Sequence, residues 1–67
     1  MLDKTKLPKV IKDFYKTSNG YRHKTKPIAI SINGNTLIVG TWRPVGAILK
    51  TIEVKNEQQA ITEIERI

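Results

Sequence analysis

The sequence predicts a single small α+β domain of the order α-β-β-β-α, in which a three-stranded antiparallel sheet is packed by two helices. Apolar residues recur at helical spacing near both ends of the chain. Between them, an Asn-Gly pair separates two runs of apolar, largely β-branched residues, which is a strong hairpin signal. The 67 residues suffice for one domain. We therefore expect residues 1–67 to fold as one unit, with residues 1–6 as a flexible basic tail.

The first helix is predicted over residues 7–20. Four apolar side chains recur at spacings typical of one helix face: Leu7, Val10, Ile11 and Phe14. Pro8 suits a first helical turn, where its missing N–H is not needed, and Gly20 suits the end of the helix. Three lysines would then form a basic ridge on the opposite side: Lys9, Lys12 and Lys16.

A β-hairpin is predicted from "PIAISINGNTLIVGTW", residues 27–42. A two-residue turn at Asn33-Gly34 would pair Ile32 with Asn35 and continue from there along both strands. The further pairs in this register are Ile30 with Leu37 and Ile28 with Val39. Five apolar residues then share one face of the sheet: Ile28, Ile30, Ile32, Leu37 and Val39. We expect this isoleucine-rich face to form the core.

The remaining elements are a third strand over residues 47–54 and a closing helix over residues 56–67. In the strand, Ile48 and Ile52 are expected on the same side. Asn56 is the expected cap of the helix. Its buried stripe is expected to consist of Ala60, Ile61, Ile64 and Ile67.

Two helices can cover such a sheet in two ways, and the sequence does not decide between them. If both helices lie on the isoleucine-rich face, the other face stays open and carries Ile38, Trp42 and Leu49. If the helices lie on opposite faces, little of the sheet stays open.

Positive charge is concentrated in the first two-fifths of the chain. Residues 1–26 hold eight Lys or Arg against two Asp, whereas residues 27–67 hold four Lys or Arg against four Glu. The whole excess of +6 therefore precedes Pro27. A concentrated field of one sign steers association with a partner of the opposite sign. We therefore expect an anionic partner, although a solvated helix face with a basic tail would have the same charge count.

Nucleic acid is the anionic partner that these residues suit best. Cationic groups on a connection can reach phosphates, which supply much of nucleic-acid affinity. A tryptophan beside cations can stack on an unpaired base, although burial or a subunit contact is the competing interpretation. We predict a small, basic, non-enzymatic DNA- or RNA-binding protein with an accessory or regulatory role. Its predicted binding residues are Lys9, Lys12, Lys16, Tyr21, Arg22, His23, Lys24, Lys26, Trp42 and Arg43.

Two other functions are compatible with the sequence. A protein-binding module or inhibitor would dock on an acidic partner protein through the apolar sheet face, which could also join two copies as a homodimer. A nuclease would need His23 as a general base, yet no carboxylate lies beside it in the sequence to orient it. The glutamates of the last helix do not converge on one face: Glu57, Glu63 and Glu65.

Composition limits which kinds of site the chain can form and in which compartment we expect it. The chain has no cysteine and one histidine, so we expect no disulfide, no metal site and no cofactor. No apolar run approaches the roughly 20 residues of a membrane span, and the first residues lack the apolar core of a signal peptide. We therefore expect a cytoplasmic protein that binds neither a membrane nor a small-molecule substrate.

The predicted order is similar to that of double-stranded-RNA-binding domains, whose central hairpin resembles "ISINGNTLIVG", and of small toxins with the same arrangement. A sheet closed by a C-terminal helix is also similar to the arm-binding domain of phage-type integrases. The final segment "NEQQAITEIERI" is acidic, whereas the RNA-binding domains have a lysine cluster there. His23 is expected before the sheet, whereas the histidine of the toxins lies within it. These likenesses concern architecture, so we assign no family and transfer no residues.

Overall fold

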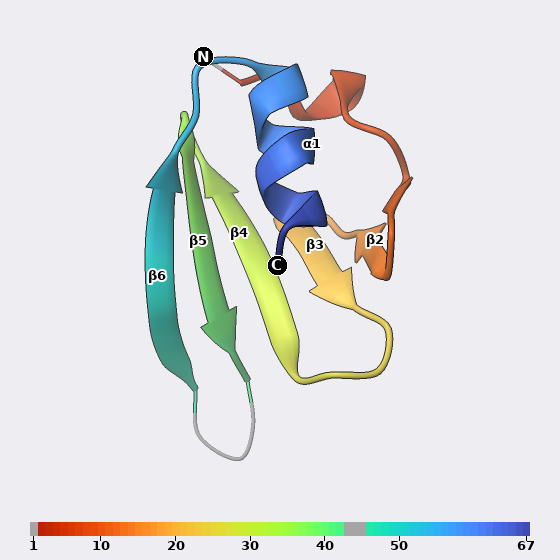
Figure 1. The fold of residues 1–67 in the computed structure, drawn as a ribbon, viewed down its shortest axis with the longest axis vertical. Coiled ribbons are helices and arrows are strands. Elements are labelled where there is room, and N and C mark those ends of the chain that lie inside the picture. Colours follow the sequence, from red (N-terminus) through yellow and green to blue (C-terminus); the bar gives the residue numbers. More distant parts are fainter. Residues whose placement is uncertain (1, 43–45) are drawn as a thin grey trace.

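Each strand of the sheet pairs with the strand that precedes it in the chain, so the order of the strands in space follows the sequence (Figure 1). The computed structural model describes residues 2–42 and 46–67. Within these residues there are six strands, all paired antiparallel. They are β1 (Val10–Ile11), β2 (Phe14–Lys16), β3 (Gly20–His23), β4 (Ile28–Asn33), β5 (Thr36–Thr41) and β6 (Ala47–Glu53).

The predicted α-β-β-β-α order is wrong, because residues 7–20 do not form a helix. They contain β1, β2 and the start of β3. Ile11 pairs with Phe14 across the two turn residues Lys12 and Asp13. A spacing of three places two residues on one face of a helix, but it also places them opposite each other across a two-residue hairpin turn. The likenesses that rested on the predicted order are lost with it.

The second hairpin forms where the sequence predicts it, but in a different register. Ile32 pairs with Leu37, and the turn residues are Gly34 and Asn35. Gly34 has a φ of 61°, and glycine with positive φ at the first turn position is typical of a type II′ turn. The predicted turn at Asn33-Gly34 is therefore wrong by one residue. The predicted core face is nevertheless confirmed, because the shift moves each partner by two positions and so preserves the face.

A β-bulge changes the register between β5 and β6. Val39 pairs with Lys50, but the next residue, Gly40, pairs with Ile48, so Leu49 has no partner across the ladder. Ile48 consequently lies opposite Gly40 on the side away from the core and is 71% exposed. The predicted alternation of the third strand is wrong at Ile48 for this reason. A Cβ atom on Gly40 would lie 2.6 Å from the Ala47 carbonyl oxygen, so the close approach requires glycine.

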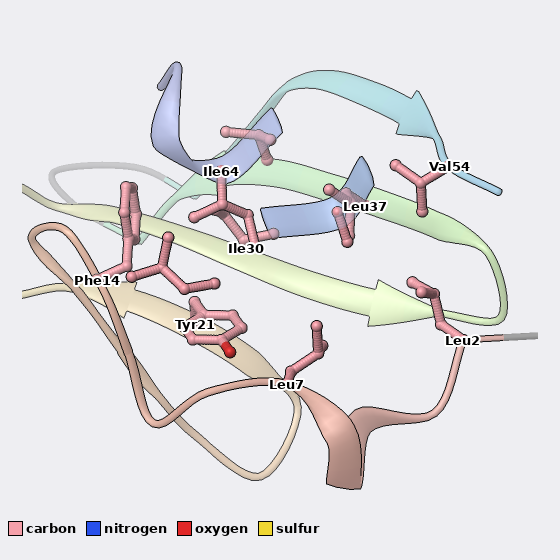
Figure 2. Packing of buried hydrophobic residues seen from close by; sticks show 11 residues of the cluster. Leu2, Leu7, Phe14, Tyr21, Ile30, Leu37, Val54 and Ile64 are labelled. Atoms are coloured by element: carbon pink, nitrogen blue, oxygen red, sulfur yellow. The ribbon is translucent and has the colours of Figure 1, made fainter. Parts of the chain in front are cut away.

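The closing helix is confirmed as α1 (Glu57–Glu65), and it covers one face of the sheet. The Asn56 side chain caps it by accepting a hydrogen bond from the Gln59 backbone N–H at 2.8 Å. In Figure 1, α1 lies in front of β3 and β4. The core between helix and sheet contains the buried side chains of Leu2, Leu7, Ile11, Phe14, Tyr21, Ile30, Leu37, Val39, Val54, Ala60 and Ile64 (Figure 2).

The N-terminal segment packs on the same side of the sheet as α1. The Leu2 side chain is buried, and its backbone N–H donates to Asn35 Oδ1 at 2.7 Å. Residues 4–6 form the 3-10 helix η1 (Lys4–Lys6), capped by the Asp3 carboxylate. Hydrogen bonds from the Thr5 side chain and backbone lower the pKa of Asp3. The flexibility expected of residues 1–6 stays a prediction.

The structure thus decides the question that the sequence left open. One face of the sheet packs against α1 and the N-terminal segment, and the other face, called the open face below, is covered by no described element (Figure 1). With nine residues, α1 is the longest helix in the described part of the chain, so none there reaches the length of a membrane span.

Candidate nucleic-acid interface

The open face is built from the residues that alternate with the buried ones along each strand. Because Phe14, Tyr21, Ile30 and Val39 point into the core, their neighbours point the other way. One continuous row crosses all six strands on this face through successive cross-strand pairs. It consists of Val10, Tyr15, Arg22, Ala29, Gly40 and Ile48.

Three members of the open face form a cluster that we call the Tyr15–Arg22–Trp42 row. Tyr15 is the direct cross-strand partner of Arg22. The Arg22 guanidinium carbon lies 4.7 Å from the centroid of the Trp42 ring, which is a cation–π contact. Tyr15 is 43% exposed and Trp42 is 37% exposed. Two aromatic rings and a guanidinium are therefore available to solvent on one side of the sheet.

A shallow depression of about 330 Å³ lies beside this row. Its floor is formed by the small residues Ala29, Ser31 and Gly40, and the apolar side chains of Ile38 and Ile48 also line it. Arg22 pairs with Ala29 across β3 and β4, so the row and the depression adjoin. The bulge contributes to this shape, because it brings Ile48 opposite Gly40.

The charge asymmetry of the sequence becomes a spatial asymmetry in this fold. Since strand order follows chain order, residues 9–26, with six Lys or Arg against Asp13, lie with β1, β2 and β3. Lys4 and Lys6 lie in η1 on the α1 side, and β4, β5, β6 and α1 come from the neutral part. Among the described residues, Asp13 is the one carboxylate within 4 Å of a cation of the basic part, and it lies 3.6 Å from Lys24. The basic side of the sheet therefore keeps most of its charge uncompensated.

The predicted site residues separate into several groups. The helical ridge of Lys9, Lys12 and Lys16 does not exist, because these residues lie along the β1–β2 hairpin. Lys9 and Lys12 are exposed. Lys16 is half-buried, and its ammonium donates hydrogen bonds to the backbone carbonyls of Lys4 and Leu7. It therefore attaches the N-terminal segment to β2.

Tyr21 belongs to the core and not to the surface. Its side chain is 1% exposed, and its hydroxyl donates to the Pro8 carbonyl oxygen. Figure 2 shows its ring between the sheet and the segment that carries Leu7. Burial raises the pKa of the Tyr21 phenol. We therefore leave Tyr21 out of the proposed binding surface.

His23 lies at the end of β3, within the sheet, and shapes the connection that carries Lys24 and Lys26. Its ring packs edge-on against Phe14, with centroids 5.0 Å apart. Its Nδ1 accepts hydrogen bonds from the backbone N–H groups of Thr25 at 3.1 Å and Lys26 at 3.0 Å. These contacts give His23 a structural role. Arg43, also predicted to bind, lies outside the described residues.

Tyr15 is a candidate site residue that the sequence analysis missed. The helix predicted over residues 7–20 gave Tyr15 no place among the binding residues, whereas β-pairing places it opposite Arg22 on the open face. The sequence signal was an alternation of faces on either side of a two-residue turn. Val10 and Tyr15 are exposed, whereas Ile11 and Phe14 point into the core. Among the described residues, no group of three metal-ligating side chains comes together.

Comparison with models of known protein families, with curated proteins and with solved structures finds no match to this chain. What the surface can bind must therefore be argued from its own residues. The described residues combine a bare sheet face, two exposed aromatic rings, a guanidinium that has no described carboxylate within 4 Å, and an adjoining set of exposed lysines.

Proposed function

We propose that this chain is a small, non-enzymatic nucleic-acid-binding protein with an accessory or regulatory role, and that it binds through the basic side of the open face. The observation that supports this most is the position of the excess charge. Residues 9–26, which hold six Lys or Arg against Asp13, lie with β1–β3, beside a sheet face that exposes Tyr15 and Trp42. Phosphates supply the affinity in such an interface, and bases supply the further contacts.

The lysines of the basic side are suited to phosphate contacts because they are exposed and carry no carboxylate partner. Lys9, Lys12 and Lys26 are exposed, and no described carboxylate lies within 4 Å of their ammonium groups. Lys24 is also exposed, and its contact with the solvent-exposed Asp13 is weak, about 0–1 kcal/mol for pairs of this kind. A phosphate could therefore displace or share that contact at small cost.

A matched pair of charge-reversal variants tests the proposal. Lys9→Glu with Lys26→Glu changes the basic side, whereas Lys50→Glu with Lys55→Glu makes the same change in net charge on exposed residues of the neutral side. We expect the first variant to bind labelled DNA and RNA oligonucleotides at least about tenfold more weakly at low salt, as measured by fluorescence anisotropy. The second should lose less than about threefold.

The salt dependence provides a second readout of the same experiment. Each phosphate contact contributes about −0.9 on a duplex, or about −0.7 on a single strand, to the slope of log affinity against log salt. The basic-side variant should have a shallower slope than the wild type. Equal weakening in both variants would mean that net charge alone drives association, and absence of binding to every oligonucleotide would refute the proposed function.

The alternative of a protein-binding module has one observation in its favour. β6 is an edge strand among the described elements, and next to its bulge Ile48 and Leu49 are highly exposed. Exposed apolar edges are sites of pairing with another chain. Such docking, or a homodimer, would respond little to salt, which distinguishes it from nucleic-acid binding.

The cytoplasmic location stays a prediction.

A further inference from the structure

We propose that the open face binds unpaired nucleobases, so that the ligand is single-stranded DNA or RNA and not a duplex. This inference rests on the proposed nucleic-acid-binding function and narrows it to one class of ligand. Three observations support the inference. They are the depression, the Tyr15–Arg22–Trp42 row beside it, and the absence of any described element that projects from this face.

The depression has the size and the lining that a planar ring requires. Its volume of about 330 Å³ is near the lower end of the range for small-molecule sites, which is about 300–1,000 Å³. Because Ala29 and Ser31 have small side chains, a ring can approach the sheet closely at these residues. Ile38 and Ile48 add apolar surface at its boundary. A base placed there would bury apolar surface without leaving a charged group of the protein unpaired.

The Tyr15–Arg22–Trp42 row supplies the other two kinds of contact that a single strand needs, which are stacking on bases and binding of a phosphate. Trp42 and Tyr15 offer exposed rings on which neighbouring bases can stack. Arg22 is one strand away from the floor of the depression, about 4.8 Å, since it pairs with Ala29. Its guanidinium is held against Trp42 and has no carboxylate within 4 Å among the described residues. It can therefore bind the phosphate that links two bases.

A duplex does not present the surfaces that this face would bind. Its bases stack on one another and expose only their edges in the grooves, which proteins read by inserting a helix or a two-stranded ribbon. The α1 helix cannot be inserted, because it lies on the other face with Ala60 and Ile64 buried in the core. Unstacked bases, in contrast, expose the flat faces that aromatic side chains on a sheet can contact.

The test compares one sequence as a single strand and as a duplex. Single-stranded oligonucleotides of about 12 nucleotides, within the usual site sizes for single-strand-binding domains, are titrated as DNA and as RNA. The same sequence is then titrated after annealing to its complement. Trp42 is the only tryptophan, so its fluorescence reports stacking directly. We expect binding of at least one single strand about tenfold tighter than of its duplex, with quenching of Trp42 by that strand.

Two variants locate the ligand. Ala29→Leu fills the floor of the depression without removing a cation, and Ser18→Leu adds similar bulk at an exposed site outside it. We expect Ala29→Leu to weaken single-strand binding about tenfold and to leave duplex binding within about threefold, while Ser18→Leu changes neither. Circular dichroism spectra show whether each variant is folded, and the comparison of strands on the wild type stands without any variant.

The outcomes separate the inference from the function on which it rests. Tighter binding of the duplex than of both single strands, or equal binding without quenching of Trp42, would overturn the inference and leave nucleic-acid binding intact. Lack of binding to all these oligonucleotides at low salt would overturn both. Tight single-strand binding that Ala29→Leu does not weaken would show that bases lie elsewhere, and would also overturn the inference.

Discussion

Leu37 and Ile38 are neighbours in β5, yet they belong to two different surfaces. Leu37 has no exposed area and packs beneath α1, whereas Ile38 lies on the open face and lines the depression. The same alternation separates Tyr21 from Arg22 and Phe14 from Tyr15. Apolar residues on the covered face hold the fold together, while those on the open face are available to a ligand. Hydrophobicity alone therefore does not tell which role an apolar residue has in this protein.

The largest effect is expected from a direct comparison of these two neighbours. Leu37→Ala should lower the free energy of unfolding by about 3 kcal/mol, because it leaves a cavity in the core. Ile38→Ala should lower it by about 1–2 kcal/mol, since Ile38 is only partly buried and its truncation leaves no closed cavity. A domain of this length has roughly 3–10 kcal/mol of stability in total, so Leu37→Ala is expected to be partly or largely unfolded.

Urea denaturation followed by circular dichroism measures both variants. Equal losses would contradict the comparison of the two faces, because they would show that Ile38 is as well packed in solution as Leu37. A loss at Ile38 that increases with protein concentration would identify a second copy of the chain as the cover, in favour of the homodimer.

A smaller effect is expected from the exposed apolar side chains themselves. Trp42→Ala should weaken binding of a labelled single-stranded oligonucleotide about tenfold, which corresponds to the loss of roughly one base stack. It should change the free energy of unfolding by less than about 1 kcal/mol, because Trp42 lies outside the core. Leu49→Ala is the control, since Leu49 is also exposed but lies outside both the row and the depression.

Anisotropy titrations measure oligonucleotide binding, and urea denaturation measures the free energy of unfolding. Equal weakening by Trp42→Ala and Leu49→Ala would indicate a general apolar docking surface instead of base stacking. A large loss of stability in Trp42→Ala would mean that Trp42 is part of the packing and that its exposure is not available to a ligand.

The smallest effect is expected from the two tyrosines, which lie on opposite faces. Tyr21→Phe removes the hydrogen bond to the Pro8 carbonyl and should cost about 1 kcal/mol at neutral pH. Burial raises the pKa of Tyr21 above the usual value for tyrosine, which is about 10. The unfolded chain therefore releases this proton first, and the wild type should lose stability as the pH rises above about 10 and towards the folded-state pKa.

Stability measured between pH 8 and 12 in steps of about one unit covers the range in which tyrosine titrates. Tyr21→Phe should lose less stability over this range than the wild type. At neutral pH, Tyr15→Phe should change the free energy of unfolding less than Tyr21→Phe does, because Tyr15 is exposed. If Tyr15→Phe cost as much stability as Tyr21→Phe at neutral pH, the assignment of the two tyrosines to the two faces would be wrong.

The sequence analysis succeeded where a local signal and the hydrophobic pattern agree. The hairpin around Gly34, its core face and the capped helix α1 were all predictable, because glycine, β-branched residues and the Asn56 cap act over a few residues. The helix expected over residues 7–20 failed, because the spacing of Ile11 and Phe14 fits a helix and a tight hairpin equally well. Lys12 occupies the turn with a φ of 51°. Positive φ is uncommon for lysine, so the residue type does not predict this conformation.

The candidate site was predictable in its charge but not in its composition. Arg22 and Trp42 were expected at a binding surface, and the structure brings them into contact. Tyr15 was missed because its face depends on whether the chain is helix or strand, and Tyr21 was included because its burial depends on the same choice. A register shift of one residue or a bulge moves a side chain to the opposite face without any change in the local sequence.

By itself the sequence determined that the chain carries an excess of positive charge in its first 26 residues, and that its centre forms a hairpin with one apolar face. Both properties are local, because charge is a sum over residues and a hairpin is set by its turn and the alternation around it. Only the tertiary structure decided that most of this charge lies with β1–β3, that α1 covers a single face, and that Tyr15, Arg22 and Trp42 meet on the other. These properties depend on pairing between distant strands, whose energy comes from the packing of the whole core and not from any one segment.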